Sequence, residues 1–138
     1  MDKPLPEVLA MIVADQIYRD DLSGTLSILG IRTVIGATSL PLHHPGLIVY
    51  AALVEGRGSI VFELRFVDID EEREPIYSID ADVTFRDPLT AVELIFEMND
   101  LVFPEKGEYR VQLLVNGQLL RERRLTVLPL NTNRGETS

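Results

Sequence analysis

The chain has 138 residues, of which 46 % are hydrophobic and 25 % are charged, the balance of a soluble globular domain. Its formal net charge is −9, with 13 Lys and Arg against 22 Asp and Glu, so we expect no nucleic acid partner. It has no cysteine, which excludes disulfides, thiol nucleophiles and thiolate metal sites.

No targeting or membrane segment is expected. The N-terminal stretch MDKPLPE lacks a positive net charge, and the apolar run that follows it is too short for a signal peptide. The longest apolar run, LIVYAALV at 47–54, is too short to cross a bilayer as a helix. We therefore expect a cytoplasmic protein with no membrane insertion.

The first predicted elements are two extended segments. VLAMIVADQIYRDD at 8–21 also satisfies helical spacing, but its β-favouring side chains and the extended segment after it favour a strand. Ser23 and Gly24 separate it from TLSILGIRTVIG at 25–36. Both segments are predicted to be strands.

The stretch LPLHHPGL at 40–47 holds the only two histidines, His43 and His44, between Pro41 and Pro45. Histidine is a common metal ligand and base, but adjacent side chains in an extended chain point to opposite sides. The two rings are therefore not expected to share a metal. We interpret the stretch as a structural loop, and a metal-dependent or hydrolytic centre at His44 is the weaker alternative.

Four later segments show the period-two alternation of half-buried strands. They are SIVFELRFVD at 59–68, PIYSIDADVTF at 75–85, TAVELIFEM at 90–98 and EYRVQLLVN at 108–116. Asn116-Gly117 favours a type I′ hairpin turn before the last strand. Residues 55–58, 68–75 and 104–107 also predict hairpins.

These elements predict one all-β domain over residues 1–138. Seven to eight strands joined by hairpins are typical of an antiparallel two-sheet β-sandwich, immunoglobulin-like or C2-like. A β-barrel is the alternative architecture. Residues 130–138 are polar and are expected to form a flexible tail.

The acidic loop at 68–74 is the candidate calcium site of the C2-like alternative, with Asp68 and Asp70 as possible ligands. Against this reading, Asp80 and Asp82 occupy the polar face of the next strand, where acidic residues are solvated. The loop itself resembles a polar hairpin tip that prevents edge pairing.

The sequence RERR at 121–124 is the only dense basic cluster, and alternation places Arg121 and Arg123 on one face. It could bind a phosphate or an acidic partner, or it could protect an edge strand by its charge. No nucleophile elbow, phosphate loop or dinucleotide fingerprint is present, so we expect neither catalysis nor a cofactor.

Apolar residues also occupy positions that alternation places on the solvent faces: Val61, Val67, Ile95 and Leu114. If they cluster, they form a patch that a monomer rarely leaves exposed. We therefore expect a non-catalytic interaction, accessory or assembly module that binds a protein partner or forms a homo-oligomer.

Several short motifs are distributed over about residues 8–128. Their residues are Ala14 and Asp15; Gly24, Leu26 and Gly30; Pro41, His44 and Pro45; and Gly107 and Tyr109. In these motifs the chain resembles a family of small uncharacterised bacterial β-sandwich proteins. The resemblance implies the fold, and it implies no activity, cofactor or partner.

Overall fold

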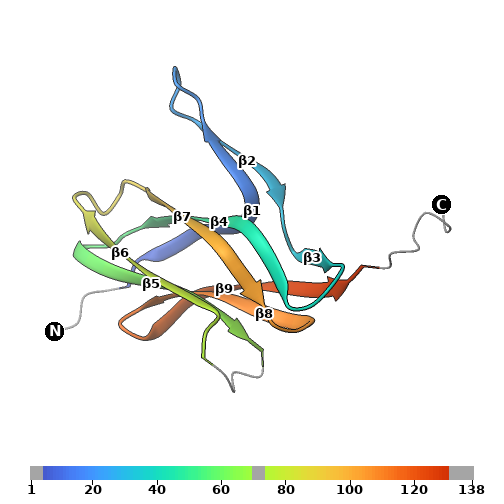
Figure 1. The fold of residues 1–138 in the computed structure, drawn as a ribbon. Coiled ribbons are helices and arrows are strands. Elements are labelled where there is room, and N and C mark those ends of the chain that lie inside the picture. Colours follow the sequence, from blue (N-terminus) through green and yellow to red (C-terminus); the bar gives the residue numbers. More distant parts are fainter. Residues whose placement is uncertain (1–4, 70–73, 131–138) are drawn as a thin grey trace.

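The computed structural model describes residues 5–69 and 74–130, which form nine strands (Figure 1). This part of the chain contains no helix, and hence none long and apolar enough to span a membrane. The all-β prediction is confirmed. The strands are β1 (Glu7–Arg19), β2 (Leu26–Ile31), β3 (Val34–Ala37), β4 (Leu42–Val54), β5 (Gly58–Asp68), β6 (Tyr77–Phe85), β7 (Val92–Phe103), β8 (Gly107–Val115) and β9 (Gln118–Pro129).

The strands form two sheets. Sheet A has the order β2-β1-β4-β7, and sheet B has the order β3-β9-β8-β5-β6. Neighbouring strands are antiparallel except β3 and β9, which are parallel, so the prediction of a wholly antiparallel fold is wrong at this pair. The strand count exceeds the predicted seven to eight because the segment at 25–36 divides into β2, in sheet A, and β3, in sheet B.

The predicted hairpins divide into two groups. Those at 68–75 and 116–117 join strands that pair with each other, and Asn116 and Gly117 both have positive φ angles (51° and 77°). The segments 55–58 and 104–107 instead connect strands of different sheets, so both hairpin predictions there are wrong. Alternating residues and a turn show where a strand ends, but they do not show which sheet the next strand joins.

The hydrophobic core contains residues of both sheets. Phe103 of sheet A packs against Phe66 and Tyr109 of sheet B, with ring centroids 6.3 Å and 5.1 Å apart. The Tyr109 hydroxyl donates a hydrogen bond to the backbone oxygen of Glu105 (2.7 Å). This bond holds the crossing from β7 to β8 against the core that both sheets share.

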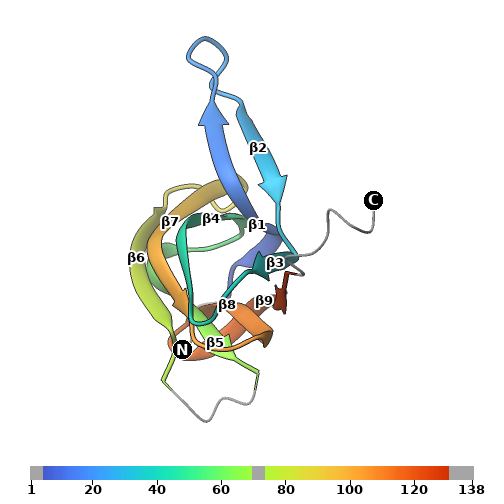
Figure 2. The same ribbon diagram turned by 45° about the vertical axis from the view of Figure 1, so that its right-hand side comes forward.

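Strand β1 has two different partners along its length. Residues Glu7–Ala14 pair with β4, and Ala14–Arg19 pair with β2. Beyond Ala14 the strand leaves the body together with β2, and the two project as a hairpin (Figures 1 and 2). We call residues 15–31 the arm and the rest of the described residues the body.

The first half of β1 is also held by two arginines of β9. Nη2 of Arg121 donates to the backbone oxygen of Val8, and Nε of Arg123 donates to that of Met11, both at 2.9 Å. These carbonyl groups lie in the part of β1 that β2 does not accompany. Arg121 and Arg123 thus connect sheet B to the backbone of sheet A.

Replacing Arg121 by Met should lower the free energy of unfolding by about 1–2 kcal/mol, because the Val8 carbonyl loses a charged donor. Chemical denaturation measures the change. Arg86→Met, at an exposed arginine after β6, is the matched control. Equal losses in the two variants would show that the link to β1 contributes nothing.

Candidate interaction surface

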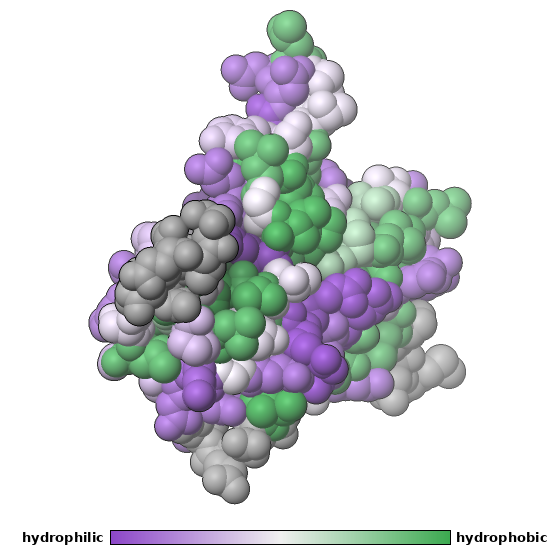
Figure 3. Space-filling model, turned by 90° about the vertical axis from the view of Figure 1, so that its right-hand side faces the viewer, coloured by the Kyte–Doolittle hydropathy of each residue, from purple (hydrophilic) through white to green (hydrophobic). Residues whose placement is uncertain are grey.

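The arm exposes apolar side chains away from the body. Leu22 at its tip is 98 % exposed, and Ile31 at its base is 65 % exposed. Figure 3 shows apolar surface at the tip of the arm and around its base. The apolar residues of the arm are Ile17, Tyr18, Leu22, Leu26, Ile28, Leu29 and Ile31.

Both faces of the arm carry apolar residues. Ile17 and Ile28 are cross-strand partners, and Leu29 is paired with Gln16 one position along, on the opposite face. A two-stranded ribbon that projects from the body has no neighbouring sheet to cover either of its faces. An isolated hairpin of this kind is marginally stable in water.

Strand β2 is an edge strand without a charged residue (LSILGI). The other long edges of the sheets carry acidic side chains: β6 has Asp80 and Asp82, and β7 has Glu93, Glu97 and Asp100. Charges on an edge strand prevent pairing with another chain. These charges therefore oppose pairing with another chain at β6 and β7, and no charged side chain opposes it at β2.

The outer face of sheet A, opposite the core, continues the apolar surface of the arm. Ile12, Tyr50 and Ile95 form one cross-strand row on this face, and each is half-buried. The Tyr50 hydroxyl donates to Glu93 of β7. Burial and this hydrogen bond raise the pKa of Tyr50 to about 12, so the hydroxyl stays protonated at neutral pH.

The base of the arm is held by an ion pair. Nε of Arg32, just after β2, donates to Oδ1 of Asp15 in β1 at 2.9 Å. Gly30 lies opposite with φ +70°, and a Cβ there would come within 2.5 Å of Asp15 Oδ2. Glycine is therefore required both for the backbone conformation and for room beside the carboxylate.

His44 lies near this ion pair. It belongs to β4, so the prediction that 40–47 is a loop is wrong beyond Pro41. Its Nδ1 accepts a hydrogen bond from the Gly46 backbone N–H (3.3 Å).

Burial lowers the pKa of His44 below its ordinary 6.5. The Asp15 carboxylate opposes that shift, and the Arg32 guanidinium adds to it. His43, its neighbour in the strand, is exposed.

Of the two residues of the acidic loop predicted as calcium ligands, the structure describes one. Asp68 is half-buried at the end of β5, and Asp70 lies outside the described residues. Within 5–69 and 74–130 there is no group of three His, Asp or Glu side chains that could hold a metal ion. Asp80 and Asp82 are exposed on β6, as the alternation predicts.

The four predicted apolar surface residues do not form one patch. Ile95 lies in sheet A, whereas the other three lie in sheet B, where Val61 is 49 % exposed. Val67 and Leu114 are buried, so the prediction that they face solvent is wrong. Their cross-strand neighbours have long side chains, Arg110 beside Val67 and Glu63 beside Leu114, whose aliphatic stems can cover an apolar residue.

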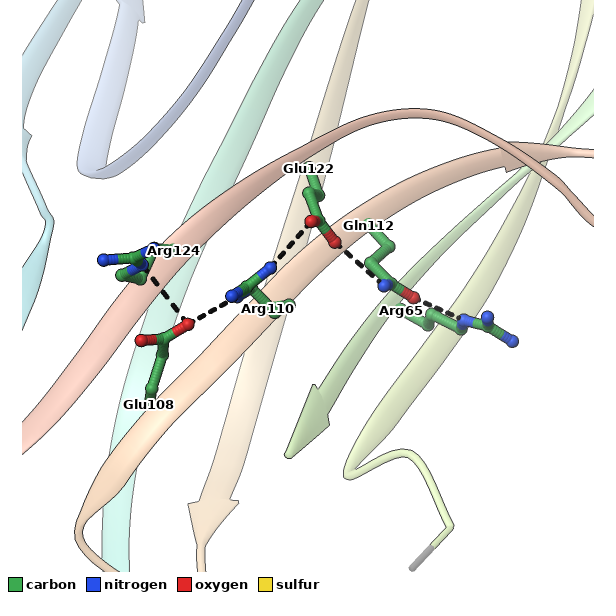
Figure 4. A network of polar contacts seen from close by, with 6 residues as sticks. All are labelled: Arg65, Glu108, Arg110, Gln112, Glu122 and Arg124. Atoms are coloured by element: carbon green, nitrogen blue, oxygen red, sulfur yellow. Dashed lines mark hydrogen bonds and ion pairs between the residues drawn. The ribbon is translucent and has the colours of Figure 1, made fainter. Parts of the chain in front are cut away.

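The outer face of sheet B carries a polar network across β5, β8 and β9 (Figure 4). Arg110 bonds to Glu108 (2.6 Å) and to Glu122 (2.7 Å). Gln112 extends the network by donating to Glu122 and accepting from Arg65, both at 3.0 Å. Arg124 contacts Glu108 from the other side at 3.2 Å. Positive and negative side chains alternate along this network, and each of its carboxylates is paired with at least one arginine.

The protein is thus all-β, with two sheets and a projecting arm. The model of a family of unknown function, DUF6941, matches residues 9–128. The chain belongs to this family, which confirms the resemblance to an uncharacterised family. No curated protein matches the chain.

The structure brings together residues that the sequence separates widely. Asp15, Gly30 and His44 are motif residues of the family resemblance, and all three lie at the base of the arm. The sequence reading missed Arg32 and the arm itself. The available signal was the uncharged segment LSILGI directly after a turn, since an uncharged edge strand is unusual.

Stability should depend on His44 near neutral pH. The lowered folded-state pKa means that the unfolded chain, with a histidine pKa of about 6.5, binds more protons than the folded chain as the pH falls through that value. The free energy of unfolding therefore falls with the pH in this window.

His44→Asn should remove that contribution, so its stability should fall less between about pH 7.5 and pH 5.5. Denaturation at a series of pH values measures the slope. His43→Asn keeps His44 and should keep the wild-type slope. An unchanged slope in His44→Asn would contradict this assignment.

Proposed function

We propose that this protein is a non-catalytic interaction module that associates with a second copy of itself through the arm. The observation that carries the proposal is the open edge of β2, which is uncharged and flanked by exposed apolar side chains. An added strand satisfies the backbone groups of such an edge and covers its apolar flanks.

A second copy fits this edge better than a charged partner does. β2 is itself an extended, uncharged strand, so two copies can pair antiparallel about a two-fold axis. The two four-stranded A sheets then become one continuous sheet. Pairing of this kind also gives each arm a neighbour beyond its own two strands, which an isolated ribbon lacks.

The charge distribution is compatible with this association. The chain as a whole carries −9, which keeps the bodies of two copies apart. The arm places the contact outside the body (Figure 2). Two of its charges are engaged locally, since Asp15 pairs with Arg32 and Arg19 donates to the Gly24 carbonyl (2.8 Å).

We further infer that the architecture is a β-sandwich of the immunoglobulin-like or C2-like class and not a closed barrel. Two sheets with separate edge strands that share one core support this inference.

Sedimentation equilibrium over a wide range of protein concentration tests the proposal. The wild type should form a dimer, and Leu29→Lys should raise the dimer Kd at least about tenfold, because a lysine ammonium on an edge strand opposes pairing. Leu29 is 48 % exposed, so the substitution should leave the monomer folded.

Val61→Lys is the matched control, because Val61 is 49 % exposed on sheet B, away from the arm. It should dimerise like the wild type. A wild type that stays monomeric at every concentration, or equal weakening by the two substitutions, would overturn the proposal.

A further inference from the structure

A depression on the body lies where β3 begins beside β9. The first pair of these strands is Val34 with Thr126, so β9 has no β3 neighbour before Thr126. The Thr126 N–H donates to the Thr33 backbone oxygen at 3.0 Å. The residues that line the depression include Thr33, Arg110, Glu122, Arg123, Arg124 and Thr126.

The lining is positive in an otherwise acidic protein. It contains three arginines and one glutamate, whereas the chain carries −9. Glu122 is engaged by Arg110 and by Gln112 (2.7 Å and 3.0 Å). Even when Glu108, which contacts Arg110 and Arg124, is counted, the cations exceed the anions by one.

Arg124 is the most accessible of the network's cations. Its side chain is 67 % exposed, and its ion pair with Glu108 uses Nε at 3.2 Å (Figure 4). A guanidinium group presents further N–H donors in a planar fork that matches the oxygens of a phosphate or carboxylate.

The backbone adds a donor at the same place. Every second N–H of a strand points to the same edge. Because the Thr126 N–H points toward β3, the Arg124 N–H points toward that edge as well, where β3 has not yet begun. The hydroxyl-bearing residues Thr33 and Thr126 also line the depression.

From this juxtaposition we infer that the depression between β3 and β9 binds an oxyanion group, a phosphate or a carboxylate carried by a ligand. The Arg124 guanidinium is the main contact, and Thr33 and Thr126 supply neutral donors beside it. This site lies on the body and does not depend on association through the arm.

Titrations with inorganic phosphate and with acetate, followed by amide NMR at fixed pH and ionic strength, test the inference. Sodium chloride replaces the probe to hold the ionic strength constant. At least one probe should cause saturable shifts at the amides of Thr33, Arg124 and Thr126. Saturation by phosphate assigns a phosphate group to the ligand, and saturation by acetate alone assigns a carboxylate.

Arg124→Gln should weaken binding of the saturating probe about tenfold, the effect of losing a charged hydrogen-bond partner. Thr33→Val should weaken it less. Arg57→Gln, at an exposed arginine between β4 and β5, should bind like the wild type. The inference is wrong if neither probe saturates these amides, or if Arg124→Gln binds as well as Arg57→Gln.

Discussion

The structure depends on the division of β1 between two partners. Its first half is a central strand that pairs with β4, and its second half pairs only with β2. Where β2 is absent, Arg121 and Arg123 take the place of a neighbouring strand and bond to the carbonyl oxygens of Val8 and Met11. Where the pairing of β1 with β4 ends, the Asp15–Arg32 ion pair and the close approach of Gly30 hold the base of the arm. A buried, well-bonded half thus anchors a half that is largely exposed.

The distribution of charge gives the surfaces different chemical character. Edge strands β6 and β7 carry acidic residues, and the outer face of sheet B carries a network of three arginines, two glutamates and one glutamine. The edge at β2 carries no charge, and the depression beside β9 carries an excess of cations. In a protein of net charge −9, we propose different ligands for these two places, an uncharged strand for the first and an oxyanion for the second.

The sequence predicted the local structure well, because period-two alternation and turn residues are local properties. The strands around Phe62, Val83 and Val111 and the turn at Asn116 follow directly from it. The sheet to which each strand belongs was not predictable, since a turn such as 55–58 can close a hairpin or cross between sheets. For the same reason the sequence could not place Arg32 beside Asp15, or show that Val67 and Leu114 are buried. The sequence singles out His44 as a possible ligand, and the structure places it near the ion pair at the base of the arm.

We propose that the edge of β2 pairs with a second copy of the chain. Hydrogen exchange of the backbone amides of 26–31, compared at low and at high protein concentration, tests it most directly. If β2 pairs with a second copy, protection of these amides rises with concentration, while protection along the edge strands β6 and β7 stays constant. Protection of β2 that does not change with concentration would contradict it.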